Sequence, residues 1–235
     1  MKILVALLSL LAILLVALPG PLYKHQILEL APAFAALRYA VYVGIAALVL
    51  LLVQIIFMRK NISWPVTAIS AVFAIVAIAL PVSMMGKAKS VPPIHDISTD
   101  LVNPPNFVAI AALRADAPNP AEYAGEETAK QQREAYPELI TEIYQQSSEQ
   151  LFEVAQAAVN DLGWTLVNAN KAAGLIEATD ETTWFGFKDD VVIRISNTGE
   201  ERFLDVRSKS RVGKSDLGKN AERIHTLLDA INAKL

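Results

Sequence analysis

Apolar side chains are concentrated in three long runs within the first 90 residues, and these runs predict helices that cross a membrane. Residues 39–58 contain one strongly polar side chain, Gln54, and at about 1.5 Å per residue they span about 30 Å of hydrocarbon. Another run covers residues 64–85, with Trp64 at its entrance, where an interfacial tryptophan is common. Residues 59–63 are too few for anything but a tight turn, so these two helices are predicted to be antiparallel.

The first apolar run, residues 3–18, follows Lys2 directly and fits either a secretory signal or a short membrane helix. A cleavable signal needs small residues three places and one place before the cut, and Leu15, Val16 and Ala17 supply only one of them. We therefore interpret this run as a helix. The predicted anchor is residues 1–90, with membrane helices over about 3–22, 37–58 and 64–85.

Residues 91–235 lack long apolar runs and show the shorter periods of a water-soluble domain. Prolines interrupt residues 91–145, which predicts an irregular segment that wraps over the surface, apart from a short helix at residues 126–135. Apolar residues then recur at helical spacing, and Ser147 with Gln150 forms a capping box at the start of that helix. The folded part of the domain is therefore predicted over residues 146–235.

Four strands and a closing helix are predicted to follow this helix. Alternating polarity and turn residues place the strands at about 164–168, 175–183, 190–196 and 202–211. The closing helix is predicted to start near Ser215 or Asp216. Together these elements predict an α+β domain in which two helices cover one face of an antiparallel sheet. Alternation places one set of side chains on the covered face, Val191, Ile193, Ile195, Leu204 and Val206, and another on the opposite face, Asp190, Arg194, Asp205, Arg207, Lys209 and Arg211.

The charge of the chain changes at the same place as its hydropathy. Residues 1–90 carry seven basic side chains against one acidic side chain, Glu29, whereas residues 91–235 carry 14 basic and 23 acidic side chains. An acidic domain of this kind has no broad basic surface, so we predict no binding to nucleic acid. The sequence has no cysteine, which excludes disulfides, thiol chemistry and cysteine-ligated zinc.

Residues 187–194 and 205–224 form the most specific stretches of the domain, with further pieces at residues 94–100, 104–107 and 162–164. These stretches resemble the uncharacterised family called domain of unknown function 1499. The resemblance implies a bacterial envelope or membrane-attached protein and supplies no established activity. The three predicted membrane helices lie outside the resemblance.

Three crossings place the two ends of the anchor on opposite sides of the membrane. Basic residues do not decide the orientation, because both sides carry similar numbers of them. A lone Lys2 before an apolar run is typical of exported chains, and Arg59 with Lys60 suits a cytoplasmic hairpin. We therefore predict a multi-pass protein of the bacterial inner membrane with its domain on the periplasmic side.

A basic cluster between Arg202 and Arg223 contains seven basic residues against three acidic ones. Arginines on one sheet face and the free amides of the closing helix would suit a phosphate or carboxylate. The alternative is a solvated face on which charges pair across strands. The cluster predicts a site for an envelope protein partner or a small anionic or lipid-like ligand at Arg194, Asp205, Arg207, Ser208, Arg211, Ser215, Asp216 and Asn220.

Evidence for catalysis in the sequence is weaker. His95, Asp96 and Asp100 are residue types that can ligate a divalent cation, although such residues more often cap turns. Residues 213–215 resemble the end of a phosphate-binding loop, but Ser208 stands where that motif requires glycine. We therefore predict a non-catalytic binding module without metal or cofactor. The rival prediction is a hydrolase or other enzyme that uses His95, Asp96 and Asp100 with Arg207 and Arg211.

Overall fold

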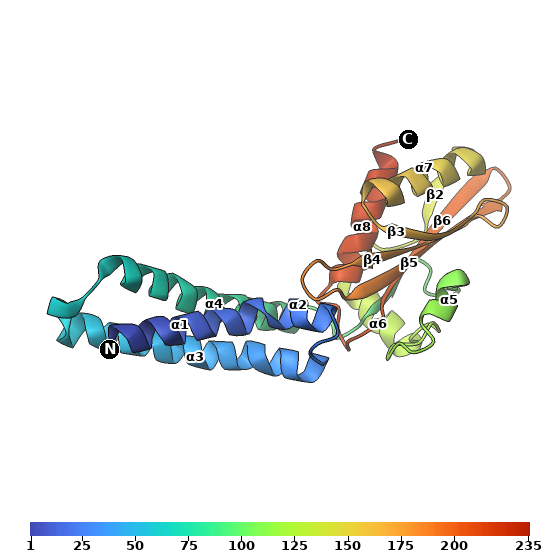
Figure 1. Ribbon diagram of the computed structural model, residues 1–235. Helices are drawn as coiled ribbons and strands as arrows, with labels where there is room; N and C mark the ends of the chain where they lie inside the picture. Colours follow the sequence, from blue (N-terminus) through green and yellow to red (C-terminus); the bar gives the residue numbers. More distant parts are fainter. The chain divides into compact units, whose positions relative to one another are not determined.

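The computed structural model describes the backbone of residues 1–235 and every side chain except that of Asn61. Contacts within the chain divide it into two units, one of residues 1–89 with 183–186 and one of residues 90–182 with 187–235. Figure 1 shows long helices, in blue to green, in the first unit and a sheet with shorter helices in the second.

Three helical segments of the first unit are long and apolar enough to cross a membrane, at Lys2–Lys24, Leu30–Phe57 and Trp64–Ser90. This confirms the three predicted runs. The second and third helices extend beyond their predicted ends, because helical hydrogen bonding continues outside the apolar stretch. The elements in chain order are α1 (Lys2–Ala17), α2 (Pro19–Lys24), α3 (Leu30–Phe57), the 3-10 turn η1 (Arg59–Asn61) and α4 (Trp64–Ser90).

Buried residues of α3 recur at alternating spacings of three and four, which gives this helix a single packing seam. Gly44 lies in the seam, and a Cβ atom there would stand 2.9 Å from Ile78 Cγ1 and 3.1 Å from the Ala74 carbonyl oxygen. Glycine therefore permits the close approach of α3 and α4, as small residues commonly do in membrane bundles. Large apolar side chains such as Val49 and Leu52 point outward and are exposed, as lipid-facing side chains are.

The loop of residues 183–186 belongs to the first unit. Trp184 Nε1 donates a hydrogen bond to the Ala17 carbonyl oxygen at 3.2 Å. A Cβ atom on Gly20 would lie 2.7 Å from the indole ring, so glycine is required beside it. Phe185 is buried, and its ring stacks on that of Phe34 with centroids 5.7 Å apart.

The second unit is built on a six-stranded sheet in the order β1-β6-β5-β4-β3, with β2 also paired to β6. Every pairing is antiparallel. The fold class is therefore α+β, as predicted. Two strands come from the segment that was predicted to be irregular, because a three-residue strand is too short to show a readable period. The strands are β1 (Asp96–Ser98), β2 (Glu142–Tyr144), β3 (Thr165–Asn170), β4 (Leu175–Glu181), β5 (Lys188–Thr198) and β6 (Glu201–Ser210).

Helices α7 (Ser148–Asp161) and α8 (Lys219–Asn232) lie on one face of the sheet (Figure 1). The predicted apolar residues of β5 and β6 are buried there with Leu151, Ile224 and other helix residues. Ser147 caps α7 by accepting a hydrogen bond from the Gln150 backbone N–H, as predicted. Helix α8 begins later than predicted, since Leu217 has a positive φ of 58° and lies outside the helix.

Residues 99–125, which include the short helix α5 (Ala109–Leu113), cover the opposite face of the sheet. Phe107 and Ile110 pack there on Val192 of β5. Helix α6 (Glu126–Ala135), which has the bounds that the sequence predicts, lies beside β1. Residues 99–125 thus turn much of the face that was expected to meet solvent into a second, partly polar interior.

A buried charge network as the candidate functional site

The sheet face beneath residues 99–125 carries the charged side chains that alternation places there. In the observed register Asp190 pairs with Lys209, and Arg194 pairs with Asp205. Because neighbouring strand residues point to opposite faces, Asp189 lies on the other side and pairs with Arg223 at 2.7 Å. The strands therefore present a row of opposite charges to the segment that covers them.

The first charged group is formed by Asp96, Arg207 and Lys209, whose side chains are almost completely buried. Arg207 donates from Nε and Nη2 to the two Asp96 carboxylate oxygens at 2.8 and 2.9 Å, which is the bidentate geometry that suits arginine. Lys209 Nζ lies 3.1 Å from the same carboxylate, and burial lowers the pKa of this ammonium. The Arg207 guanidinium also lies 4.9 Å from the centroid of the Phe107 ring.

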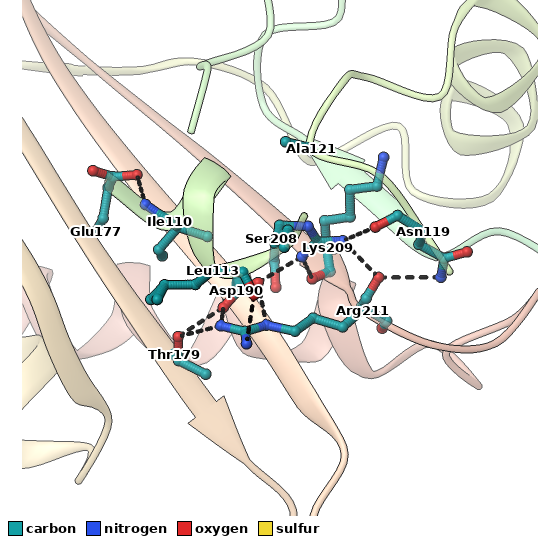
Figure 2. A network of polar contacts seen from close by, with 12 residues as sticks. Ile110, Leu113, Asn119, Ala121, Glu177, Thr179, Asp190, Ser208, Lys209 and Arg211 are labelled. Atoms are coloured by element: carbon teal, nitrogen blue, oxygen red, sulfur yellow. Dashed lines mark hydrogen bonds and ion pairs between the residues drawn. The ribbon is translucent and has the colours of Figure 1, made fainter. Parts of the chain in front are cut away.

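The second group surrounds Asp190, where Figure 2 shows Arg211 and Thr179 converging on the carboxylate. Arg211 donates from Nε and Nη2 at 2.8 Å each, and Thr179 Oγ1 donates at 2.7 Å. Arg114, at the end of α5, is the third residue that donates to Asp190, from Nη1 at 2.6 Å, and its side chain is itself buried. No sequence pattern points to Arg114, because this residue stands in an alanine-rich stretch far from the strands.

Arg114 and Arg207 also bind the backbone of the segment that covers them. Arg114 Nη2 donates to the Asn119 carbonyl oxygen of that segment and to the Ser210 carbonyl oxygen of β6, both at 2.9 Å. Arg207 donates to the carbonyl oxygens of Pro105 at 3.1 Å and Ala121 at 2.9 Å. The buried charges therefore satisfy the polar backbone of an irregular segment that would otherwise be costly to bury.

The third group reaches solvent. Arg194 Nη2 donates to Asp205 at 2.7 Å and to Asp100 at 2.8 Å, and the Arg194 and Asp100 side chains are 30% and 21% exposed. Thr141 Oγ1 donates to Asp205 at 2.6 Å. Burial alone would raise the pKa of Asp100, but hydrogen bonds from the Asn103 and Val102 backbone and from Arg194 outweigh it, and its pKa is lowered.

Glu177 of β4 is a further buried carboxylate that the sequence analysis missed. It accepts hydrogen bonds from the Val108, Ala109 and Ile110 backbone N–H groups at 2.7, 2.9 and 3.2 Å (Figure 2 draws Ile110). Asn168 Nδ2 donates to it at 3.0 Å. Glu177 thus caps α5 from a position 67 to 69 residues away in the sequence, which no local motif reveals.

Positive and negative charges balance on this face. Five basic and five acidic side chains lie on this face. Four of the carboxylates form ion pairs with basic side chains, whereas Glu177 accepts hydrogen bonds from backbone N–H groups and from Asn168. Three members of the basic cluster seen in the sequence, Arg207, Lys209 and Arg211, are thus paired with acidic residues from other segments. The charged network residues are Arg114, Arg194, Arg207, Lys209 and Arg211 with Asp96, Asp100, Glu177, Asp190 and Asp205.

The remaining predicted site residues lie on the helix side of the sheet. Ser208 Oγ donates to Asn220 Oδ1 at 2.7 Å. The Asp216 carboxylate accepts from the Gly218 and Asn220 backbone N–H groups at 2.8 Å each, and burial raises the pKa of Asp216. Ser215 Oγ accepts from the Leu217 N–H at 3.2 Å. The structure therefore splits the eight predicted residues between two faces, and Asp216 already occupies the amides that were predicted to attract an anion.

The three predicted metal-ligand candidates do not converge. Asp96 is bound by Arg207 and Lys209, and Asp100 is bound by Arg194. His95 is half-buried, its Nδ1 lies 3.4 Å from the Lys214 carbonyl oxygen, and burial lowers its pKa. Among the side chains that the structure describes, no group of three or more histidine, aspartate or glutamate residues is arranged to hold a metal ion.

Residues 96–231 match the family described as "Protein of unknown function (DUF1499)". This match covers more than half of the chain. The chain belongs to the DUF1499 family. The resemblance expected from the sequence is thereby confirmed, and no curated protein matches the chain.

The matched region of this DUF1499 protein begins at Asp96, the first residue of β1, and ends within α8. It therefore contains all ten charged network residues, whereas the three apolar helices lie outside it. A cleft of about 390 Å³ lies elsewhere, between the start of α7, the β3–β4 turn and the end of β5. None of the predicted site residues lines this cleft.

Proposed function

We propose that this DUF1499 protein is a membrane-anchored, non-catalytic envelope protein whose residues 91–235 form a binding module for a protein partner. The observation that supports this most directly is the closed charge network. The groups best suited to chemistry hold one another and the covering segment in place.

An enzyme needs its reacting groups to converge on an accessible cavity. Asp96 and Arg207 are fully buried, and the hydrogen bonds of the Arg207 fork are all directed at protein oxygens. His95 is bound to a different segment. These placements argue against the rival hydrolase, because Asp96 and Arg207 are closed off from substrate and His95 is not directed toward them.

The part of the network that reaches solvent is the best place for a partner. Arg194 and Asp100 are partly exposed there. Val102, two residues after Asp100 in the sequence, is 84% exposed. Ile143 of β2 is 53% exposed, two residues from Thr141, which binds the same Asp205 carboxylate. Arginine is enriched at protein interfaces, and the balanced charge favours a protein over a small anion.

Photocrosslinking in the producing cell tests the module. A benzoylphenylalanine at Ile143 should give a discrete crosslinked product, which Arg194→Ala should weaken. The control position is Asp229, exposed on α8 and so on the other face of the sheet. A product of the same size and yield at Asp229, or no product at Ile143, would contradict a partner site at this surface.

For localisation, we infer the bacterial inner membrane with residues 91–235 in the periplasm. The support is the three apolar helices, an odd number of crossings, together with Lys2 at the start of the first. Alkaline phosphatase fused after Leu235 should be active in intact cells, and green fluorescent protein at the same junction should be dark. The reverse result would place the domain in the cytoplasm while leaving the crosslinking test unaffected.

A further inference from the structure

Positive charge gathers at one end of the helical unit, where the first span ends, α3 begins and α4 ends. Lys24 closes α2, Arg38 lies in the early part of α3, and Lys87 and Lys89 lie in the last turn of α4. We propose that Arg38 and Lys89 hold anionic phospholipid headgroups at this end. The inference rests on the three helices spanning a bilayer, and it does not depend on the partner proposed above.

The depth of Arg38 fits a headgroup layer. From Arg38 to Arg59 the chain advances about 31 Å at about 1.5 Å per residue, which matches a hydrocarbon core of about 30 Å. Tyr39 and Tyr42 follow Arg38, are both 59% exposed, and lie edge to face with ring centroids 6.4 Å apart. Tyrosines are enriched at this depth, so Arg38 and the two rings mark one membrane surface.

Lys89 reaches the same layer. Helices α3 and α4 meet where Gly44 approaches Ala74 and Ile78. Arg38 lies six residues before Gly44 in α3, and Lys89 lies eleven residues after Ile78 in the antiparallel α4. The two basic residues therefore lie five residues apart along the helix axes, or about 8 Å, which extended basic side chains can bridge. Both side chains are exposed. Lys24 and Lys87 take part in other contacts; for example, Lys24 Nζ donates to the Thr183 carbonyl oxygen at 3.5 Å. The proposal therefore rests on Arg38 and Lys89.

Anionic lipid is the favoured occupant because basic side chains outnumber acidic ones at this end of the helical unit, where Glu29 is the acidic residue beside four basic ones. Residues 91–235 carry 14 basic and 23 acidic side chains and follow Lys89 directly in the chain. The positive charges of Arg38 and Lys89 offset part of the repulsion between a domain of that charge and an anionic membrane, and they attract lipid phosphate at this end. Each basic side chain at the surface favours anionic over neutral lipid by roughly fivefold. Free phosphate gains no such advantage, because two exposed side chains form no enclosed site for it.

Site-directed fluorescence on the full-length chain tests the proposal. The sequence has no cysteine, so a single Cys at Tyr42 or at Val66 carries the only label. Tyr42 reports on the end with Arg38, and Val66, which is also exposed, reports on the end with Arg59 and Lys60. The chain is placed in nanodiscs of phosphatidylcholine and phosphatidylglycerol, and one of the two lipids at a time carries a spin label near its headgroup. The quenching by labelled phosphatidylglycerol divided by the quenching by labelled phosphatidylcholine gives the lipid selectivity ratio at each probe.

At the Tyr42 probe we expect a several-fold preference for phosphatidylglycerol, which Arg38→Gln with Lys89→Gln reduces to near one. The matched double variant Arg59→Gln with Lys60→Gln should leave that ratio unchanged and lower the ratio at the Val66 probe instead. Arg38→Lys should retain the preference, which separates loss of charge from loss of fold. The proposal is overturned if the Tyr42 ratio is near one in the parent chain, if the Arg38 and Lys89 variant keeps it, or if the opposite-end variant lowers it equally.

Discussion

Replacing Asp190 by asparagine should destabilise the second unit strongly. The Asp190 side chain is fully buried and receives donors from Arg114, Arg211 and Thr179. Asparagine keeps the shape but removes the charge, which leaves the Arg114 guanidinium buried without a carboxylate. Breaking a buried ion pair in this way costs about 3 to 5 kcal/mol, because the remaining charge stays desolvated.

Urea unfolding of the full chain in mild detergent measures this cost. Trp164 packs against the main core of the second unit and reports on its unfolding, while the apolar helices resist urea. With an m-value of about 2 kcal/mol per molar, the midpoint should fall by roughly 2 M. The control is Glu153→Gln, which removes one partner of the exposed Lys171 pair and should leave the midpoint unchanged.

A double variant separates lost charge from lost packing. Leucine at both Asp190 and Arg114 removes the buried pair together, and Arg211, whose side chain is 16% exposed, can turn toward solvent. Buried pairs replaced by apolar residues are often neutral in stability, but leucine at Arg114 also removes the donors to the Asn119 and Ser210 carbonyl oxygens, so the double variant should recover only part of the lost free energy. An Asp190→Asn midpoint equal to that of Glu153→Gln would refute the reasoning, because it would mean that these charges are hydrated.

Three further outcomes are expected. Tyr123→Phe should not lower the melting temperature, because its buried hydroxyl has no hydrogen-bond partner among the described residues, whereas Tyr144→Phe loses a 2.9 Å bond and should cost about 1 kcal/mol by calorimetry. Gly44→Val should disrupt the α3–α4 contact and lower the thermal stability of the helical unit in detergent, whereas Ala46→Val on the exposed side should not. The folded pKa of Asp100 is lowered, so the contribution of its carboxylate to the free energy of unfolding is complete at pH values above the ordinary pKa of 3.8. That contribution is lost as the pH falls through the folded pKa. Asp100→Asn should therefore flatten the acid limb of stability measured by urea titration at a series of pH values.

Patterns that repeat within a few residues were readable from the sequence. Apolar runs predicted the three long helices, and alternation placed Val191 and Ile193 on the helix-covered face, with Asp190 on the other. The bounds of α6 and the N-cap at Ser147 were also predicted. Each of these features depends on local backbone periodicity or on a cap a few residues long, so the order of the residues suffices to determine it.

The fate of the charged face was decided only by the tertiary structure. Asp190 meets Arg114 across 76 residues, Arg207 meets Asp96 across 111, and Glu177 caps a helix nearly 70 residues away. No local period encodes such pairs, so the sequence did not reveal that Arg207 and Arg211 are paired with acidic residues of other segments. The fold brings acidic residues and an irregular covering segment onto this face, and burial then makes each unpaired charge so costly that the network closes on itself.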